Sequence, residues 1–316
     1  MGTRRRIAAA LATSALGAVA FAAPALAATA PPDGSNNYAF RTLDNSKDPT
    51  FNQLLGINNN GLISGYFGAG TKGHPNKGYL LHQPYGSQQS YINENFPHSE
   101  QTQVTGLNDN GVTVGFWVDE NGNNNGFYAI NHKRFTTANA PGSGEAKPRV
   151  DQLLGVNDSG IAVGFYNDTK GNAHGYTYNI ARHRFGSVKV PGATSVTATA
   201  INNLNDIAGF ETNSGNTVSF LRESNGKLIT LSFPGASATQ AFGVNDGDEV
   251  VGAYMVGTGN NAQTFGFAWT PGFGFQTVND PNGVGATTIN GVNDRGQLVG
   301  FYTGGDGNVH GLLATP

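Results

Sequence analysis

One short pattern occurs six times along the chain, and this repetition limits the folds that the chain can adopt. Each copy centres on an asparagine, and seven residues after it there is always a glycine. The asparagines are Asn58, Asn108, Asn157, Asn202, Asn245 and Asn293, and the glycines are Gly65, Gly115, Gly164, Gly209, Gly252 and Gly300. The asparagines are separated by 50, 49, 45, 43 and 48 residues. This period is too long for one coil of a β-helix and suits a unit of four short strands.

The residues around each asparagine predict a tight hairpin. The third residue after it is always Gly, Asn or Asp, namely Gly61, Gly111, Gly160, Asn205, Asp248 and Gly296. These types tolerate the positive φ that a type I turn followed by a left-handed residue requires. The asparagine side chain can fold back onto the turn as an Asx-turn. We therefore interpret Asn-Asp-x-Gly as a turn signal rather than as a metal or catalytic motif.

The segments around these turns predict four strands per unit. In the third unit they are residues 153–156, 161–166, 175–178 and 188–190. Both faces of the second strand are largely apolar, so both faces are expected to be buried. Six such sheets predict an all-β fold, a six-bladed β-propeller of four-stranded antiparallel blades, in which each blade packs between two neighbours.

The two ends of the chain complement each other. The last unit stops after its third strand at residues 310–313, and a spare strand lies at residues 38–43. An N-terminal strand that completes the last blade would close the ring and remove its open edges. An open β-solenoid, or two three-bladed halves, is the alternative and leaves these ends unexplained. We expect a short linker at residues 28–37 and one propeller domain at residues 38–316.

Residues 1–27 have the features of a secretory signal peptide. Arg4, Arg5 and Arg6 precede an apolar run, and small residues lead up to Ala27. No stop-transfer segment follows, so membrane insertion is not expected, and the protein is predicted to be secreted or periplasmic. The chain has no cysteine, which excludes disulfides and lipid attachment through a cysteine.

The charge balance excludes some partners. Without the three signal arginines the chain has 15 basic and 21 acidic residues, a net charge of −6. A nucleic-acid partner requires a strongly basic surface, so none is expected. We expect a monomer that binds a glycan or a protein.

The units resemble the extracellular HAF-repeat family of bacterial exported proteins. The resemblance covers nearly all of the mature chain through the Gly-[Ile/Val/Leu]-Asn-[Asp/Asn]-x-Gly core and through Pro191-Gly192 and Pro234-Gly235. The family's histidine is kept at His174 and His310 and is replaced elsewhere, for example by Asn125. The resemblance implies a propeller fold and export, and it implies no defined activity.

Two sets of repeated positions are candidate ligand sites at the end opposite the hairpins, which we call the top face. Five residues before each repeat asparagine is a polar residue, expected to surround the central channel: Gln53, Gln103, Gln152, Thr197, Gln240 and Thr288. Their amides and hydroxyls could bind a ligand or simply cap the strand ends. Two residues after each repeat glycine are Phe67, Trp117, Tyr166, Glu211, Tyr254 and Tyr302. The five aromatic side chains could stack on sugar rings or fill the space between blades, and Glu211 is the exception to the pattern.

Three acidic, asparagine-rich loops form the third candidate set, and they contain Asp119, Asp168 and Asp306. Carboxylate and amide oxygens are calcium ligands, but no loop has the full alternating Asp spacing, and turn propensity explains the composition. We therefore expect no cofactor, with Ca²⁺ as the alternative. His174 and His310 are expected on opposite blades, too far apart to share a metal.

No catalytic motif is recognisable, because the chain has neither Gly-x-Ser-x-Gly nor His-Glu-x-x-His. We therefore favour a binding or scaffold module with its glycan or protein ligand on the top face. The alternative is a hydrolase or lyase of an extracellular polymer, with Asp119, Asp168, Glu211 and Asp306 as candidate acids and bases. A purely structural envelope component is a third reading.

Overall fold

The computed structural model describes residues 33–257, 262–284 and 286–316. The predicted signal peptide lies outside the described residues, as do the first five residues of the predicted linker. The described chain consists of strands and three short 3₁₀ helices, η2 (Ser35–Asn37), η3 (Gln88–Ser90) and η4 (Pro141–Gly144). The all-β prediction is confirmed. None of the helices in the described ranges has the length and apolar character needed to cross a membrane.

The strands follow the repeat. The first and second units contain β2 (Asn52–Ile57), β3 (Ile63–Phe67), β4 (Lys77–Leu81), β5 (Tyr91–Asn93), β6 (Gln101–Leu107), β7 (Val112–Val118), β8 (Asn124–Ile130) and β9 (Arg134–Thr137). The third and fourth contain β10 (Asp151–Val156), β11 (Ile161–Asn167), β12 (Ala173–Asn179), β13 (Arg184–Ser187), β14 (Ser195–Ile201), β15 (Ile207–Asn213), β16 (Asn216–Arg222) and β17 (Leu228–Leu231). The fifth and sixth contain β18 (Ala238–Val244), β19 (Val250–Val256), β20 (Gln263–Thr270), β21 (Gly274–Thr277), β22 (Thr287–Val292), β23 (Leu298–Thr303) and β24 (Val309–Thr315).

Within each unit the strands pair antiparallel in chain order. The fourth and fifth units share one eight-stranded sheet, joined by a single parallel pair at Thr217 and Ala238. The sixth sheet takes its fourth strand from the other end of the chain, because β1 (Ala39–Thr42) pairs with β24. The predicted complementarity of the two ends is therefore present in the strand pairing.

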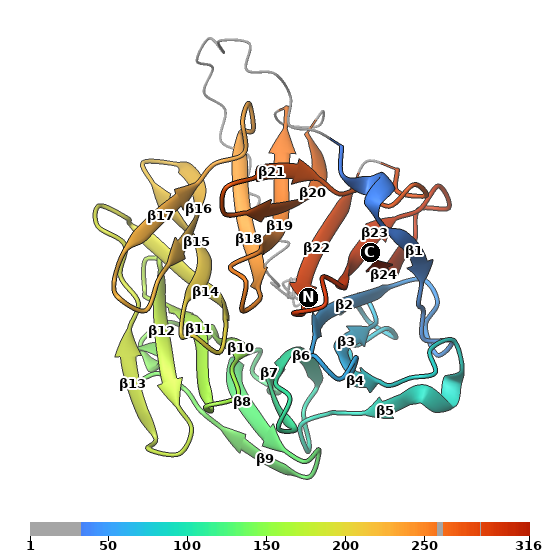
Figure 1. Cartoon of the computed structure of the whole chain (residues 1–316). Coiled ribbons are helices and arrows are strands. Elements are labelled where there is room, and N and C mark those ends of the chain that lie inside the picture. The colour runs from blue at the N-terminus through green and yellow to red at the C-terminus, as the bar shows by residue number, and fades with distance from the viewer. Residues whose placement is uncertain (1–32, 258–261, 285) are drawn as a thin grey trace, which may run out of the picture.

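The first strands of the units lie around a common centre, with the other strands outside them (Figure 1). Each first strand contacts the first strand of the next unit, and β22 contacts β2. Apolar side chains fill the spaces between units: one cluster joins Val114 and Tyr128 of the second unit to Leu153 and Tyr176 of the third. The prediction that both faces of the second strand are buried is confirmed, for example in β7, where the consecutive residues 113–116 are all buried.

The repeat asparagines link each hairpin to the next. Each Nδ2 donates to the backbone oxygen of the following repeat asparagine, from Asn58 to Asn108 and onward, and Asn293 donates to Asn58. Within its own turn, Asn58 Oδ1 accepts hydrogen bonds from the N–H groups of Asn60 and Leu62. The predicted Asx-turn is confirmed, and the same side chain also joins neighbouring units.

The repeat glycines stand where two strands approach closely. A Cβ atom at Gly164 would lie 2.0 Å from the backbone oxygen of Gln152, and one at Gly300 would lie 1.9 Å from that of Thr288. The corresponding distances at the other four glycines are 2.0 to 2.3 Å. No side chain fits at such distances, which explains why the position is glycine in all six units.

Candidate functional site

A groove of about 550 Å³ opens on the top face of the third unit. The residues that matter for its chemistry come from β11, β12, β13 and the segment after β13: Tyr166, His174, Gly175, Tyr176, Ser187 and Lys189. Ala140, Pro141 and Gly142, in the connection from the second unit to the third, also line it. The lining also includes Val196 of β14 in the fourth unit, so the groove combines aromatic rings and hydrogen-bond donors of the third unit with segments of both neighbouring units.

Tyr166 and His174 form the aromatic part of this groove. Their ring centroids lie 5.1 Å apart with an interplanar angle of 22°. His174 Nε2 is 3.0 Å from Asp168 Oδ2, and this hydrogen bond lowers the pKa of Asp168 below its usual range. The His174 side chain is 45% exposed. Asp168 thus fixes one ring nitrogen, and the rest of the imidazole remains accessible.

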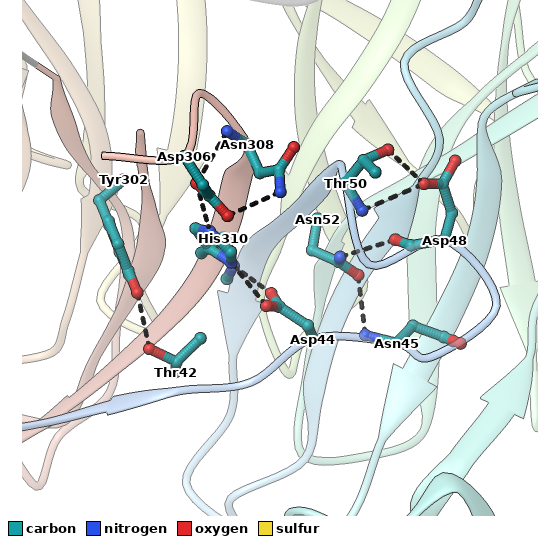
Figure 2. Close-up of polar contacts among 11 residues, drawn as sticks. Thr42, Asp44, Asn45, Asp48, Thr50, Asn52, Tyr302, Asp306, Asn308 and His310 are labelled. Atoms are coloured by element: carbon teal, nitrogen blue, oxygen red, sulfur yellow. Dashed lines mark hydrogen bonds and ion pairs between the residues drawn. The ribbon is translucent and has the colours of Figure 1, made fainter. Parts of the chain in front are cut away.

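The sixth unit contains the same three residue types in a similar arrangement. Tyr302 and His310 lie 5.2 Å apart at 29°, and His310 Nε2 is 3.2 Å from Asp306 Oδ1. Here a second carboxylate is present, because Asp44 Oδ2 lies 2.7 Å from His310 Nδ1 (Figure 2). Burial alone would lower the pKa of His310, but the hydrogen bonds to Asp44 and Asp306 outweigh it and raise this pKa. Only a protonated imidazole donates to both carboxylates at once.

Two other units cover their aromatic residue with phenylalanine. Phe96 stacks on Trp117 at 4.5 Å and 4°, and Phe233 stacks on Tyr254 at 3.5 Å and 7°. Each phenylalanine immediately precedes a proline, and before Pro141 the residue is the smaller Ala140. Tyr166 therefore has no such cover in the third unit.

A threonine at the end of the fourth strand holds the aromatic residue in three units. Thr137 accepts from Trp117 Nε1 at 3.3 Å, and Thr277 and Thr42 bond the hydroxyls of Tyr254 and Tyr302 at 2.9 and 2.8 Å. In the third unit this position is Ser187, and the Tyr166 hydroxyl has no hydrogen-bond partner among the described residues. It lies instead against Gly142, where an added Cβ would be only 2.6 Å from it.

The predicted polar ring is buried at the start of the first strands. Gln53 Oε1 accepts from the Tyr66 hydroxyl at 2.8 Å, and Gln152 Nε2 donates to Asn124 at 3.2 Å. Gln103, Thr197, Gln240 and Thr288 are also buried. The two central cavities, each of about 80 Å³, are lined by other residues, such as Asp158 at one end and Leu55 and Phe242 further in. A ligand role for the ring remains a prediction.

The candidate acids and bases stand on four different units, so the structure does not pair them. Asp119 belongs to the second unit and accepts from the N–H groups of Asn121 and Asn123 in its own loop. Burial raises its pKa, but these bonds and that of the Asn123 side chain outweigh it, so the pKa is lowered. Glu211, in the fourth unit, has a raised pKa because it is partly buried. Within the described ranges, no three His, Cys, Asp or Glu side chains are grouped to hold a metal.

Sequence reasoning missed three residues of these sites, Lys189, Ser187 and Asp44. Their signal is positional: each lies at or just after the end of a fourth strand, where other units have threonine or asparagine. Alignment on the repeat asparagine does not reveal this correspondence for Asp44, because its strand lies at the opposite end of the chain.

No protein-family profile and no curated protein matches the chain. Solved structures match it by shape. A putative TolB from Agrobacterium tumefaciens is 12% identical, with a TM-score of 0.53, and the match covers 85% of this chain and 91% of that one. AofleA from Arthrobotrys oligospora is 10% identical, with a TM-score of 0.53 and coverage of 87% and 85%. A streptogramin B lyase is 12% identical, with a TM-score of 0.47 and coverage of 88% and 98%.

At these identities the likeness concerns the fold alone. The matched proteins are of the β-propeller type, so the chain has a propeller-like fold. Membership of the HAF-repeat family stays a prediction.

Proposed function

We propose that the protein is an exported, closed six-bladed β-propeller that binds a glycan in the groove of the third unit. The pairing of β1 with β24 and the cycle of asparagine hydrogen bonds from Asn58 back to Asn58 support six blades and closure. The predicted signal peptide at residues 1–27 supports export to the periplasm or the medium. Detection of a mature chain that begins just after Ala27 outside the cytoplasm tests that part of the proposal.

The observation that carries the binding function is the half-buried Tyr166 of the third unit, over which no phenylalanine is stacked. In the second, fifth and sixth units this aromatic residue is stacked under phenylalanine or hydrogen-bonded to threonine. The Tyr166 ring instead stacks on His174 and lines a groove, and its hydroxyl has no partner among the described residues. The volume of about 550 Å³ lies in the range of small-molecule sites. An aromatic ring beside several hydrogen-bond donors suits a sugar, which has an apolar face and hydroxyl edges.

Filling the groove from within tests this proposal. Ser187 is exposed on β13 and lines the groove, so Ser187→Trp places a large side chain there. Thr136→Trp is the matched control, because Thr136 is exposed on β9 of the second unit and does not line the groove. Calorimetric titration with neutral and acidic oligosaccharides should show binding by the unmodified protein and by T136W, and at least about tenfold weaker binding by S187W.

Two results would contradict the proposal. Equal affinity in S187W and T136W would place the sugar elsewhere on the molecule. If no oligosaccharide bound, glycan binding would be rejected. The remaining hypothesis would then be a protein ligand.

A further inference from the structure

Four units place a side-chain acceptor at one position just after the fourth strand. There, Asn95, Asn139 and Asn279 accept through Oδ1 from the N–H of a glycine in the third strand, at 3.0, 2.9 and 3.1 Å. The sixth unit does the same with a carboxylate, since Asp44 Oδ1 accepts from Gly311 N–H at 3.0 Å. The glycine N–H at the top of the third strand therefore takes an acceptor from the chain itself in all four.

The third unit has the glycine and lacks the acceptor. Val188 N–H donates to the oxygen of Gly175 at 2.9 Å, as Leu43 N–H donates to that of Gly311 at 2.8 Å, so Val188 and Leu43 are equivalent. The next residue, equivalent to Asp44, is Lys189. An ammonium group is a donor only, so Lys189 cannot accept from the Gly175 N–H. Gly175 and Lys189 both line the groove.

The histidines of the two units differ in the same way. In the sixth unit Asp306 bonds Nε2 of His310 and Asp44 bonds Nδ1. In the third unit Asp168 bonds Nε2 of His174, and Nδ1 has no partner among the described residues. The groove thus contains a backbone N–H, an imidazole nitrogen and an ammonium group, at the place where the sixth unit holds a carboxylate.

Asp44 shows that a carboxylate fits between the glycine N–H and the histidine Nδ1. Its Oδ2 lies beside His310 Nδ1 (Figure 2). Its Oδ1 accepts from Gly311 N–H, so one carboxylate satisfies both groups. We infer that the groove of the third unit binds the carboxylate of a uronic acid residue, with Gly175 N–H, Lys189 Nζ and the Nδ1 of a protonated His174 as the donors that hold it. This inference rests on the proposed glycan function and names the class of sugar.

The charges around the groove agree with an anionic ligand. Lys189 is exposed and has no carboxylate partner among the described residues. Asp168 is engaged by His174 Nε2 and by the backbone of its own loop at Lys170 and Asn172. The buried Asp151 accepts from the Tyr176 hydroxyl and from Ala140 N–H. Both carboxylates are therefore bonded within the protein, and hydrogen bonds to an ionised acceptor are the stronger kind.

The test compares oligogalacturonate with its methyl ester, with a neutral cello-oligosaccharide and with a short peptide that has a free C-terminal carboxylate. Lys189→Asp gives the third unit the carboxylate that the sixth unit has, and Lys189→Asn gives it the residue of the first, second and fifth units. Lys170→Asp is the matched control, an exposed lysine of the neighbouring loop that does not line the groove. Thermal melts verify that all three variants fold.

We expect oligogalacturonate to bind the unmodified protein and K170D, and to bind K189D and K189N at least about tenfold more weakly. The methyl ester should also bind at least tenfold more weakly than the acid. If the ester binds as well as the acid and K189D binds both unchanged, the carboxylate inference is wrong while the glycan function stands. If only the peptide binds, in a manner that K189D abolishes, the carboxylate site stands and the glycan function is wrong. If no probe binds, both are wrong.

Discussion

The third and sixth units contain the same tyrosine, histidine and aspartate, yet one is open and the other is filled by its own chain. In the sixth unit Asp44 bonds both His310 and Gly311. In the third unit Lys189 stands at that position, and a groove of about 550 Å³ remains. The sixth unit is where the N-terminal strand joins the last sheet, so a bonded side chain there stabilises the junction. The third unit is continuous in sequence, and its equivalent position is free to face a ligand.

The largest loss of stability should come from substituting the repeat glycine, which both units have. Gly164→Ala and Gly300→Ala each place a Cβ about 2 Å from a backbone oxygen of the neighbouring strand. Each substitution should lower the free energy of unfolding by about 3 kcal/mol or more, because the strands must move apart. Urea unfolding measures this. A cost below 1 kcal/mol in either unit would mean that the glycine is not required there by packing.

The next largest loss of stability should occur in the sixth unit and not in the third. Asp44→Ala removes hydrogen bonds from Gly311 and His310 and should cost about 2 kcal/mol of unfolding free energy. Lys189→Ala, at the equivalent position, should change it by less than about 0.5 kcal/mol because Lys189 is exposed. If chemical denaturation gave equal losses of unfolding free energy for Asp44→Ala and Lys189→Ala, Asp44 would contribute no more to stability than Lys189, contrary to this prediction.

A smaller difference is expected at the tyrosines. Tyr302→Phe removes the hydrogen bond with Thr42 and should cost about 1 kcal/mol. Tyr166→Phe removes a hydroxyl that has no partner among the described residues, and its cost should be close to zero. If denaturation showed a larger cost for Y166F than for Y302F, Tyr166 would have a structural partner after all.

The smallest effect concerns pH. The hydrogen bonds of Asp44 and Asp306 outweigh burial and raise the pKa of His310. The protonated form is therefore favoured by folding, and its contribution is complete below the unfolded pKa of about 6.5 and lost as pH rises through the folded value. The stability advantage of the unmodified protein over His310→Gln should shrink between pH 6 and pH 9. If the difference in unfolding free energy between the two proteins did not change with pH in this window, a protonated His310 bonded to Asp44 and Asp306 would be contradicted.

The sequence predicts those features of this fold that depend on local chemistry. The positive φ after Asn202 and Asn245 falls on Asn205 and Asp248, and the Asx-turn at Asn58 is present. These depend on residues a few positions apart, so a repeat makes them visible. Pairing of the chain ends could be predicted because each end is incomplete without the other.

The groove could not be predicted from such local patterns, because it forms where one aromatic residue, Tyr166, lacks contacts that its equivalents in other units make. Tyr166 lacks a phenylalanine over its ring because that position is Ala140, and Ser187 on another strand does not hold its hydroxyl. The match between Lys189 and Asp44 requires knowing that β1 lies beside β24. Such contacts join segments far apart in sequence, and no local pattern encodes them.

The most direct test of the central claim is a crystal structure of the protein with oligogalacturonate. We predict a uronic acid carboxylate in the groove of the third unit, within hydrogen-bond distance of Gly175 N–H and His174 Nδ1 and beside Lys189. A saccharide bound in the central channel or between other units, with this groove empty, would contradict it.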